Sequence, residues 1–287
     1  MIPAEHALRT CLALKLWSIE RKSHAMALVA DEGLALFAGL NAFPRKSYLS
    51  EYSSRIDQRK TTQLLAGWHE QVSGTDLFPG ESFNLDFHSV PYYGQDSVVE
   101  NHYVSARSRR QPSILVFLAQ DATTHAFCYS NADLRKGEKA QEFFQFITFW
   151  KRAHGKLTRY AQRMLIENAL SDAVRFFHID ALSSVVGLKV DFDMALLVVA
   201  SGLYRLIAER MRGYTHAKAR QIFRDLIDMP AIVTLAAKEV CVSFHRRAHL
   251  PIVLASGLTD KPVPVPWWNG VPLRLTTYNG SEINSVS

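Results

Sequence analysis

The middle of the chain most constrains the fold, because its pattern is that of strands followed by a helix. Apolar and polar residues alternate over 83–88, as in a strand with one buried face. Residues 113–119 predict a second, strongly apolar strand, and residues 125–130 return as its hairpin partner. An amphipathic helix over 138–153 ends at Gly155, a residue typical of helix C-termini. The order strand–strand–strand–helix predicts a mixed α+β fold.

The N-terminal region has helical spacing. We expect helices over about 8–19, 34–40 and 49–68. A Gly-bearing turn and the basic residues near Arg55 are compatible with a DNA-binding helix-turn-helix. An ordinary helical bundle with a solvated basic face explains the same spacing, and spacing alone favours the bundle.

The C-terminal half reads as helices and then a hairpin. We expect helices over 158–177, 190–211 and 216–229, a hairpin within 232–244, and a frayed tail after Pro262. Gly155 runs almost directly into the helix at 158, so the strand that an RNase H-like core has after its first helix is missing. The predicted architecture is a partial RNase H-like core of three strands plus helices, with a helical N-terminal region and a small C-terminal hairpin. The expected segments are 1–78 (helical, a candidate helix-turn-helix), 79–156 (first part of the core), 157–213 (core helices) and 214–287 (basic helix, hairpin and tail).

Composition excludes several classes of protein. Of 287 residues, 48% are hydrophobic and 21% charged, which supports a buried core and argues against disorder. The cysteines Cys11, Cys128 and Cys241 are odd in number and form no CxxC pair, which argues for a reducing compartment. The opening residues lack the apolar core of a secretory signal. The longest apolar stretch, 194–208, is shorter than the roughly 20 residues of a membrane helix, so we expect no membrane association and a cytoplasmic protein.

Asp86 is the first candidate for chemistry. An acid in the middle of a central strand is costly unless it is paired or binds a metal. Carboxylates hold the two divalent ions of a phosphoryl-transfer site. A strand acid that faces solvent or pairs with an arginine is the alternative, and Asp86 alone favours that alternative.

Tyr160, Arg163 and Glu167 form the second candidate, since spacings of three and seven place them on one helix face. A carboxylate with an arginine one turn before it suits a site that holds a metal-bound phosphate. The alternative is a surface helix with a local Arg–Glu pair, which contributes little energy.

Basic residues gather in three places and suggest a polyanionic partner. The stretch 205–224 holds six Lys or Arg against one acid, which is most of the net charge of +6. Such clusters position a nucleic-acid backbone without reading its sequence, although helix-surface charge is an alternative explanation. We expect Arg107, Arg109 and Arg110 to lie in the loop before the apolar strand at 113–119. The candidate DNA contacts are Arg107, Arg109, Arg110, Arg210, Arg212, Lys218, Arg220, Arg224, Arg246 and Arg247.

The chain resembles a known protein family along nearly its whole length. The stretches FNLDFHSVPYYG (83–94), ENHYVSARSRRQPSILVFLAQD (100–121) and RYAQRMLIENALSDAVRFFHIDALSS (159–184) are prominent in it. The chain resembles bacterial insertion-sequence transposases of the DDE type, which have an RNase H-like core. It is similar to the group whose last acid lies in a Tyr-x2-Arg-x3-Glu-x6-Lys signature.

The resemblance assigns roles to residues of this chain and also exposes two departures. It implies that Asp86 is the first catalytic Asp and Glu167 the catalytic Glu, both metal ligands, with Tyr160 and Arg163 as signature partners. The signature Lys falls on Val174. The block that carries the second catalytic Asp in the family is absent, because the segment ending at Lys156 continues directly into the Tyr-Arg-Glu stretch.

Intact relatives are expected to transpose DNA by two-metal strand cleavage and transfer, with Mg²⁺ or Mn²⁺, at the terminal inverted repeats of duplex DNA. We expect this chain to be an internally deleted, catalytically inactive form with weak or no metal binding, in the bacterial cytoplasm near the nucleoid. One alternative is a non-catalytic DNA-binding fragment that inhibits intact transposase by mixed assembly or associates with itself. The other is a pseudogene product with a damaged fold and no function.

Overall fold

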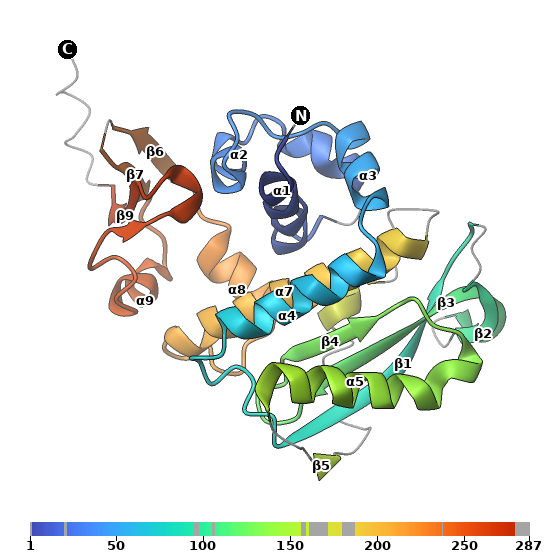
Figure 1. The fold of residues 1–287 in the computed structure, drawn as a ribbon. Helices are drawn as coiled ribbons and strands as arrows, with labels where there is room; N and C mark the ends of the chain where they lie inside the picture. The colour runs from blue at the N-terminus through green and yellow to red at the C-terminus, as the bar shows by residue number, and fades with distance from the viewer. Residues whose placement is uncertain are drawn as a thin grey trace. The chain divides into compact units, whose positions relative to one another are not determined.

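The computed structural model describes residues 2–19, 22–94, 98–104, 107–155, 159–160, 172–179, 187–236 and 238–278. The chain divides into two units, Met1–Arg205 and Leu206–Ser287 (Figure 1). Each unit contains both helices and strands, so the expected mixed α+β class is confirmed.

The first unit begins with helices, as the spacing predicts. They are α1 (Ala4–Leu16), the 3₁₀ helix η1 (Lys22–Leu28), α2 (Glu32–Ala38), α3 (Lys46–Ser54) and α4 (Gln58–Gln71). The single helix expected over 49–68 is wrong, because the chain breaks between α3 and α4. Asp57 adopts an extended conformation there, and its side chain accepts a hydrogen bond from the Lys60 N–H. This N-cap starts α4 as a separate helix.

The sheet of the first unit has five strands: β1 (Ser82–Pro91), β2 (Glu100–Val104), β3 (Arg109–Asp121), β4 (Phe127–Asn131) and β5 (Arg159–Tyr160). Its order is β2-β3-β1-β5, with β4 also paired to β3. The three predicted strands are confirmed as β1, β3 and β4. The sequence pattern missed β2, which pairs antiparallel with the first residues of β3.

A short fourth strand follows the helix after β4, contrary to the expectation that this strand is missing. β5 pairs in parallel with β1, and Arg159 and Tyr160 lie beside Ser82 and Phe83. Tyr160 was expected in a helix over 158–177, and its assignment to a strand corrects that prediction. This pairing joins segments far apart in sequence, which helical spacing cannot reveal.

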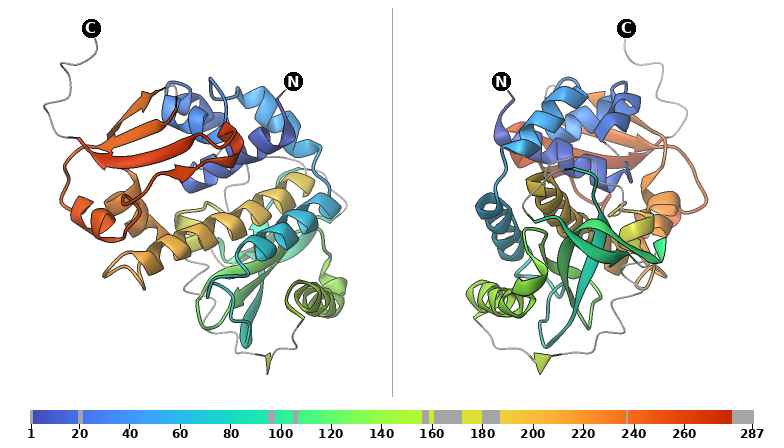
Figure 2. Two further views of the ribbon diagram at one scale, coloured as in Figure 1. Left: turned by 60° about the vertical axis from the view of Figure 1, so that its left-hand side comes forward. Right: turned by 90° about the vertical axis from the view of Figure 1, so that its right-hand side faces the viewer.

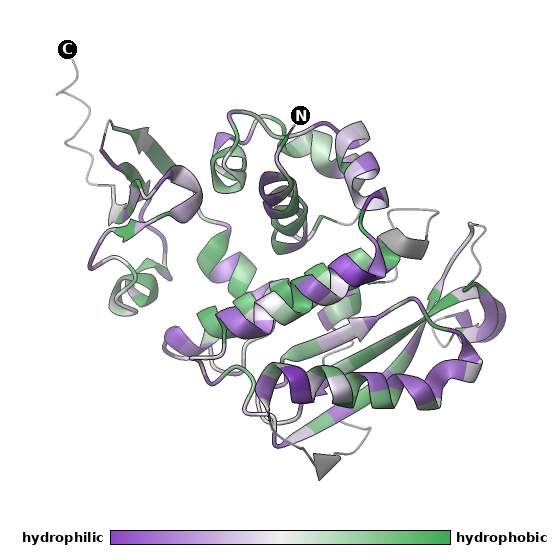
Figure 3. Cartoon of the chain, in the orientation of Figure 1, coloured by the Kyte–Doolittle hydropathy of each residue, from purple (hydrophilic) through white to green (hydrophobic). Residues whose placement is uncertain are grey.

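Helix α5 (Lys139–His154) packs against the sheet through an aromatic layer. The Phe146 ring lies 5.0 Å from Phe83 and 5.5 Å from Tyr129, centroid to centroid. Trp150, one turn later, lies 4.5 Å from Phe83. Figure 3 shows apolar colour along the strands and hydrophilic colour on the outward side of α5. The amphipathic spacing of α5 therefore builds this half of the core.

Helix α7 (Gly187–Arg210) begins in the first unit and ends in the second. Phe192 and Leu196 of α7 join a core cluster with residues of α1, α2 and α3. Figure 2 shows α4 and α7 side by side in both views, and Gly202 of α7 lies against the Trp68 ring of α4. The long apolar helix expected at 190–211 is therefore confirmed as a buried element.

The second unit contains a sheet of four strands where a hairpin and a frayed tail were expected. Its elements are α8 (Ala219–Ile222), the π-helical turn η5 (Phe223–Ile227), β6 (Ala231–Leu235), β7 (Val240–Phe244), α9 (Leu250–Ala255), β8 (Val263–Pro264), η6 (Pro266–Trp268) and β9 (Pro272–Thr277). The hairpin β6–β7 is confirmed. The expected fraying is wrong for residues 263–277, because β9 pairs in parallel with β7.

Gly80 supports the packing of α5, and its replacement tests that contact. Its φ is +71°, and a Cβ at this position would lie 2.2 Å from Cζ2 of the buried Trp150. We expect Gly80→Ala to lower the free energy of unfolding by about 2–4 kcal/mol, from left-handed strain plus overpacking.

Gly155→Ala is the matched control for Gly80→Ala. Gly155 also has a positive φ, +66°, but among the described residues no atom lies within 4 Å of a Cβ there. It should cost only the backbone strain of about 1 kcal/mol. Urea unfolding of both variants measures the difference, and equal losses would contradict the Trp150 contact.

Candidate functional site

Asp86 lies in the middle of β1, half-buried, on the face of the sheet that points away from α5. Its neighbours along that face are Asn84 and His88, because side chains two residues apart share a face. Asn84 is buried, and its amide donates to Gln120 Oε1 on β3 at 3.1 Å. A polar stripe therefore follows β1, as the alternation in the sequence predicts.

Of the predicted partners of Asp86, only Tyr160 lies among the described residues, and it does not lie beside Asp86. Tyr160 lies on β5 beside Phe83, three residues before Asp86, which is roughly 10 Å along the strand. Arg163 and Glu167 lie outside the described residues. The described residues of β5, the strand that pairs in parallel with β1, are Arg159 and Tyr160, and neither is a carboxylate.

Two of the three basic residues expected in the loop before the apolar strand lie in strand β3 instead. Arg109 and Arg110 belong to β3, opposite Val104 and Tyr103 of β2, so their expected placement in a loop is wrong. Pairing with β2 extends β3 toward its N-terminus. The residues of this extension are polar, so the apolar pattern of the sequence did not predict it. Arg107 is exposed and donates a hydrogen bond to the Tyr93 hydroxyl.

The second unit carries most of the net positive charge of the chain. Residues 206–287 hold ten Lys or Arg against six Asp or Glu. Five of the predicted DNA contacts there are exposed and make neither an ion pair nor a side-chain hydrogen bond among the described residues. We call them the unpaired cations: Arg210, Arg212, Lys218, Arg220 and Arg246.

The remaining predicted contacts of this unit are held by the protein itself. Arg224 makes two hydrogen bonds to Asp225, at 2.7 and 3.2 Å. Those bonds hold the pKa of Asp225 below its ordinary value, against the effect of burial. Arg247 donates to the Asp228 carbonyl at 2.8 Å. Both arginines therefore have fewer donors left for a phosphate than the unpaired cations have.

Sequence reasoning missed a buried polar network that joins the sheet edge to three helices. The Asn131 amide donates to Glu142 Oε2 of α5 at 2.8 Å, and its oxygen accepts from Gln58 of α4 at 3.3 Å. Asp191 of α7 accepts from the Ala132 N–H at 2.9 Å. A signal was present in the sequence, because Glu142 shares a helix face with Phe146 four residues later.

Burial raises the pKa of both acids in this network. The pKa of Asp191 rises from 3.8 to about 6, chiefly through burial, while the hydrogen bond from Ala132 opposes the shift. The pKa of Glu142 is raised by burial as well, and the Asn131 amide opposes it. A low-dielectric surrounding disfavours the charged form of a carboxyl group. The network therefore links stability to pH.

A second missed feature is a pair of histidines from α4 and α5. His69 Nε2 lies 2.7 Å from the Cys128 carbonyl, so this nitrogen carries the proton. His69 Nδ1 then accepts from His154 Nε2, 2.6 Å away. The pKa of His69 is lowered to about 4, chiefly by burial, while the hydrogen bond to the Cys128 carbonyl opposes the shift and the neighbouring His154 adds to it. His69 is therefore neutral at neutral pH.

The described residues contain no group of three or more His, Cys, Asp or Glu side chains arranged to hold a metal ion. Within the same ranges, none of the helices combines the length and apolar character needed to cross a membrane. No protein-family model, curated protein or solved structure matches this chain. The function is therefore argued from the residues and their geometry.

Proposed function

We propose that this protein is a transposase derivative that binds duplex DNA and does not cut it. The observation that carries the proposal is the set of unpaired cations, which leaves phosphate-binding groups exposed on one unit. Arginine and lysine side chains neutralise backbone phosphates and release counterions, which drives binding of any sequence. The net charge of the second unit, which contains all five unpaired cations, has the sign that this mode of binding requires.

The order of the first sheet supports the transposase origin. Three antiparallel strands, a helix across one face, and a parallel strand on the free side of β1 follow the plan of an RNase H-like core. In such a core, Asp86 occupies the position of the first catalytic carboxylate. The resemblance puts the second carboxylate in the strand after the helix, and the described residues of that strand are Arg159 and Tyr160, neither of which is an acid.

We expect no strand cleavage by this chain. Two-metal phosphoryl transfer needs carboxylates that bridge and position both ions. Asp86 and Glu167 alone would hold one Mg²⁺ or Mn²⁺ weakly, without the in-line geometry that transfer requires.

Salt-dependent binding tests the DNA-binding half of the proposal. The fourfold variant with glutamine at Arg210, Arg212, Lys218 and Arg220 should bind a fluorescent duplex more weakly by anisotropy. The slope of log affinity against log salt should fall by about 3–4, since each phosphate contact contributes about 0.9. An unchanged slope would contradict the assignment of these side chains to phosphate contacts.

Two single variants provide matched controls for this measurement. Arg212→Gln should lower the slope by about 0.9. Arg274→Gln removes the same charge from the same unit, but Arg274 is bound to Glu239 at 3.1 Å, so we expect no change of slope. Asp86→Ala should bind with unchanged affinity, since Asp86 is not one of the unpaired cations. Metal-dependent nicking of terminal-repeat DNA by the unmodified chain, lost in Asp86→Ala, would overturn the non-catalytic half.

A further inference from the structure

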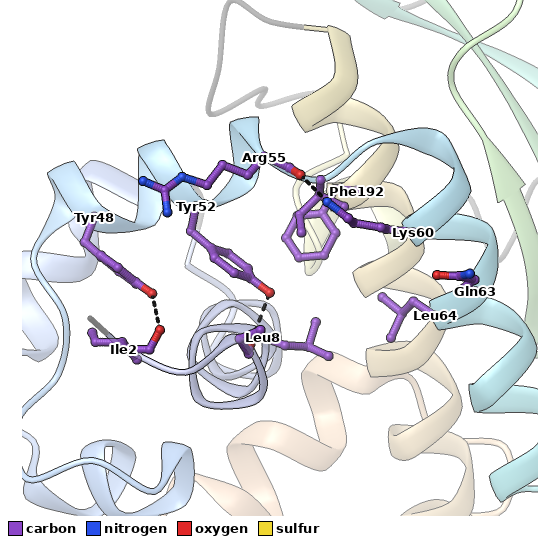
Figure 4. A pocket seen from close by; sticks show the side chains of 11 residues that line it. Ile2, Leu8, Tyr48, Tyr52, Arg55, Lys60, Gln63, Leu64 and Phe192 are labelled. Atoms are coloured by element: carbon purple, nitrogen blue, oxygen red, sulfur yellow. Dashed lines mark hydrogen bonds between the residues drawn. The ribbon is translucent and has the colours of Figure 1, made fainter.

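A pocket of about 520 Å³ lies among α1, α3, α4 and α7 in the first unit (Figure 4). This volume is within the range of small-molecule sites. Neither the sequence patterns nor the DNA-binding proposal accounts for it. Its lining combines an apolar wall with a cationic end.

The wall of the pocket is aromatic. The Tyr48 and Tyr52 rings are stacked, with centroids 6.3 Å apart and planes 18° from parallel. The Phe192 ring meets Tyr52 edge to face at 6.2 Å. Leu8 and Leu64 extend the apolar lining.

The tyrosine hydroxyls are already used within the protein. Tyr48 donates to the Ile2 carbonyl and Tyr52 to the Ala4 carbonyl, both at 3.1 Å. Burial raises the pKa of Tyr52 to about 12, so its hydroxyl stays protonated as a donor. The two residues therefore offer ring surface rather than hydroxyl groups to a ligand, as Figure 4 shows.

Lys60 makes one end of the pocket cationic, whereas the Arg55 guanidinium points away from that end, toward Tyr48 (Figure 4). Arg55 and Lys60 are the charged side chains among the described residues that line the pocket, and Gln63 adds an amide. Arg55 binds Glu51 through one nitrogen, and Lys60 donates to the Arg55 carbonyl at 2.9 Å. An ammonium has three N–H donors, so Lys60 keeps donors for a further acceptor.

We propose that this pocket binds a small amphipathic anion, with an aromatic or branched apolar body against Tyr48, Tyr52 and Phe192 and one acidic group at Lys60. The apolar wall provides affinity through burial, and the cationic end selects the charge. A neutral apolar molecule would leave the cationic end unused, and a highly charged one would leave the aromatic wall without a partner.

The probe pair anilinonaphthalene sulfonate and N-phenylnaphthylamine tests this directly, because the two share a ring system and differ by the sulfonate. We expect the sulfonate probe to bind the full chain once per molecule, and more tightly than the neutral probe, by fluorescence titration. Lys60→Gln should weaken the sulfonate probe about two- to fivefold, as for an exposed ion pair, and leave the neutral probe unchanged. Equal affinity of the two probes would overturn the assignment of an anion.

Arg59→Gln is the matched control, since Arg59 is exposed on the same helix and does not line the pocket. Equal weakening in Arg59→Gln and Lys60→Gln would show general surface attraction and overturn the site. Leu64→Trp fills the cavity and should weaken both probes at least tenfold. Sulfonate binding that survives this change, in a chain with an unaltered thermal transition, would place the probe elsewhere. The exposed position of Lys60 keeps the charge test valid even where Leu64→Trp impairs folding.

Discussion

Replacing Phe146 by alanine is expected to lower the free energy of unfolding by about 3–5 kcal/mol, the usual cost of removing a buried phenylalanine. Phe146 is 1% exposed and its ring contacts Phe83 and Phe117 of the sheet, Tyr129 of β4 and Trp150 of its own helix. Its loss leaves a cavity between α5 and the sheet that the surrounding rings cannot close without moving the helix. Urea unfolding followed by circular dichroism measures the effect.

Phe144 supplies the control on the same helix. It is 68% exposed, so Phe144→Ala should change the free energy of unfolding by no more than about 0.5 kcal/mol. Both substitutions remove the same atoms and change the helix propensity equally. Similar losses in the two variants would contradict the packing of α5 on the sheet described above.

The pH dependence of stability is the second large effect, and two buried groups drive it in opposite directions. The pKa of Asp191 is about 6 in the folded protein against 3.8 ordinarily. Between these values the folded state holds a proton that the unfolded chain has released, so stability falls as pH rises from 3.8 to 6. The pKa of His69 is about 4 against 6.5. There the unfolded chain holds the extra proton, so stability rises as pH rises from 4 to 6.5.

Each shift corresponds to about 3 kcal/mol at 1.36 kcal/mol per pKa unit. The two contributions therefore nearly cancel between pH 4 and 6, and single variants are needed to separate them. Asp191→Asn keeps an oxygen that accepts from the Ala132 N–H while removing the titration. We expect the free energy of unfolding of this variant, relative to the unmodified chain, to rise by about 2 kcal/mol between pH 4 and 6.

His69→Gln should give the opposite difference, because glutamine still donates to the Cys128 carbonyl but does not titrate. Its unfolding free energy, relative to the unmodified chain, should fall by about 3 kcal/mol between pH 4 and 6.5. Asp76→Asn removes an exposed carboxylate and serves as the control for the loss of one acidic side chain. A flat difference for Asp191→Asn would contradict the burial that raises its pKa.

Several elements follow from residue spacing because their cause is local. The alternation around Asp86 predicted β1 and its polar face, and the apolar face of 138–153 predicted α5 and its end at Gly155. The prediction from residue spacing was wrong at Asp57, where a single side-chain cap divides one expected helix into α3 and α4. That failure is also local, and an Asp three residues before a helix N–H would have revealed it.

The candidate sites also divide into those that the sequence predicts and those that only the structure shows. The basic residues were visible in the sequence, but only the structure separates Arg224, held by Asp225, from Arg212, which keeps its donors. The pocket beside Tyr52 and the His69–His154 pair had no sequence signal, since their residues come from separate helices. The assignments of catalytic roles to Asp86 and Glu167 stay predictions.

The sequence by itself determined the class of the fold, the main strands and helices, and the excess of positive charge, because periodicity and composition act over short stretches of chain. Only the tertiary structure decided the pairing of β5 with β1 and of β9 with β7, which contradicted the expected missing strand and frayed tail. The physical reason is that backbone groups in such short strands are satisfied by partners far away in sequence, and residue spacing carries no record of those partners.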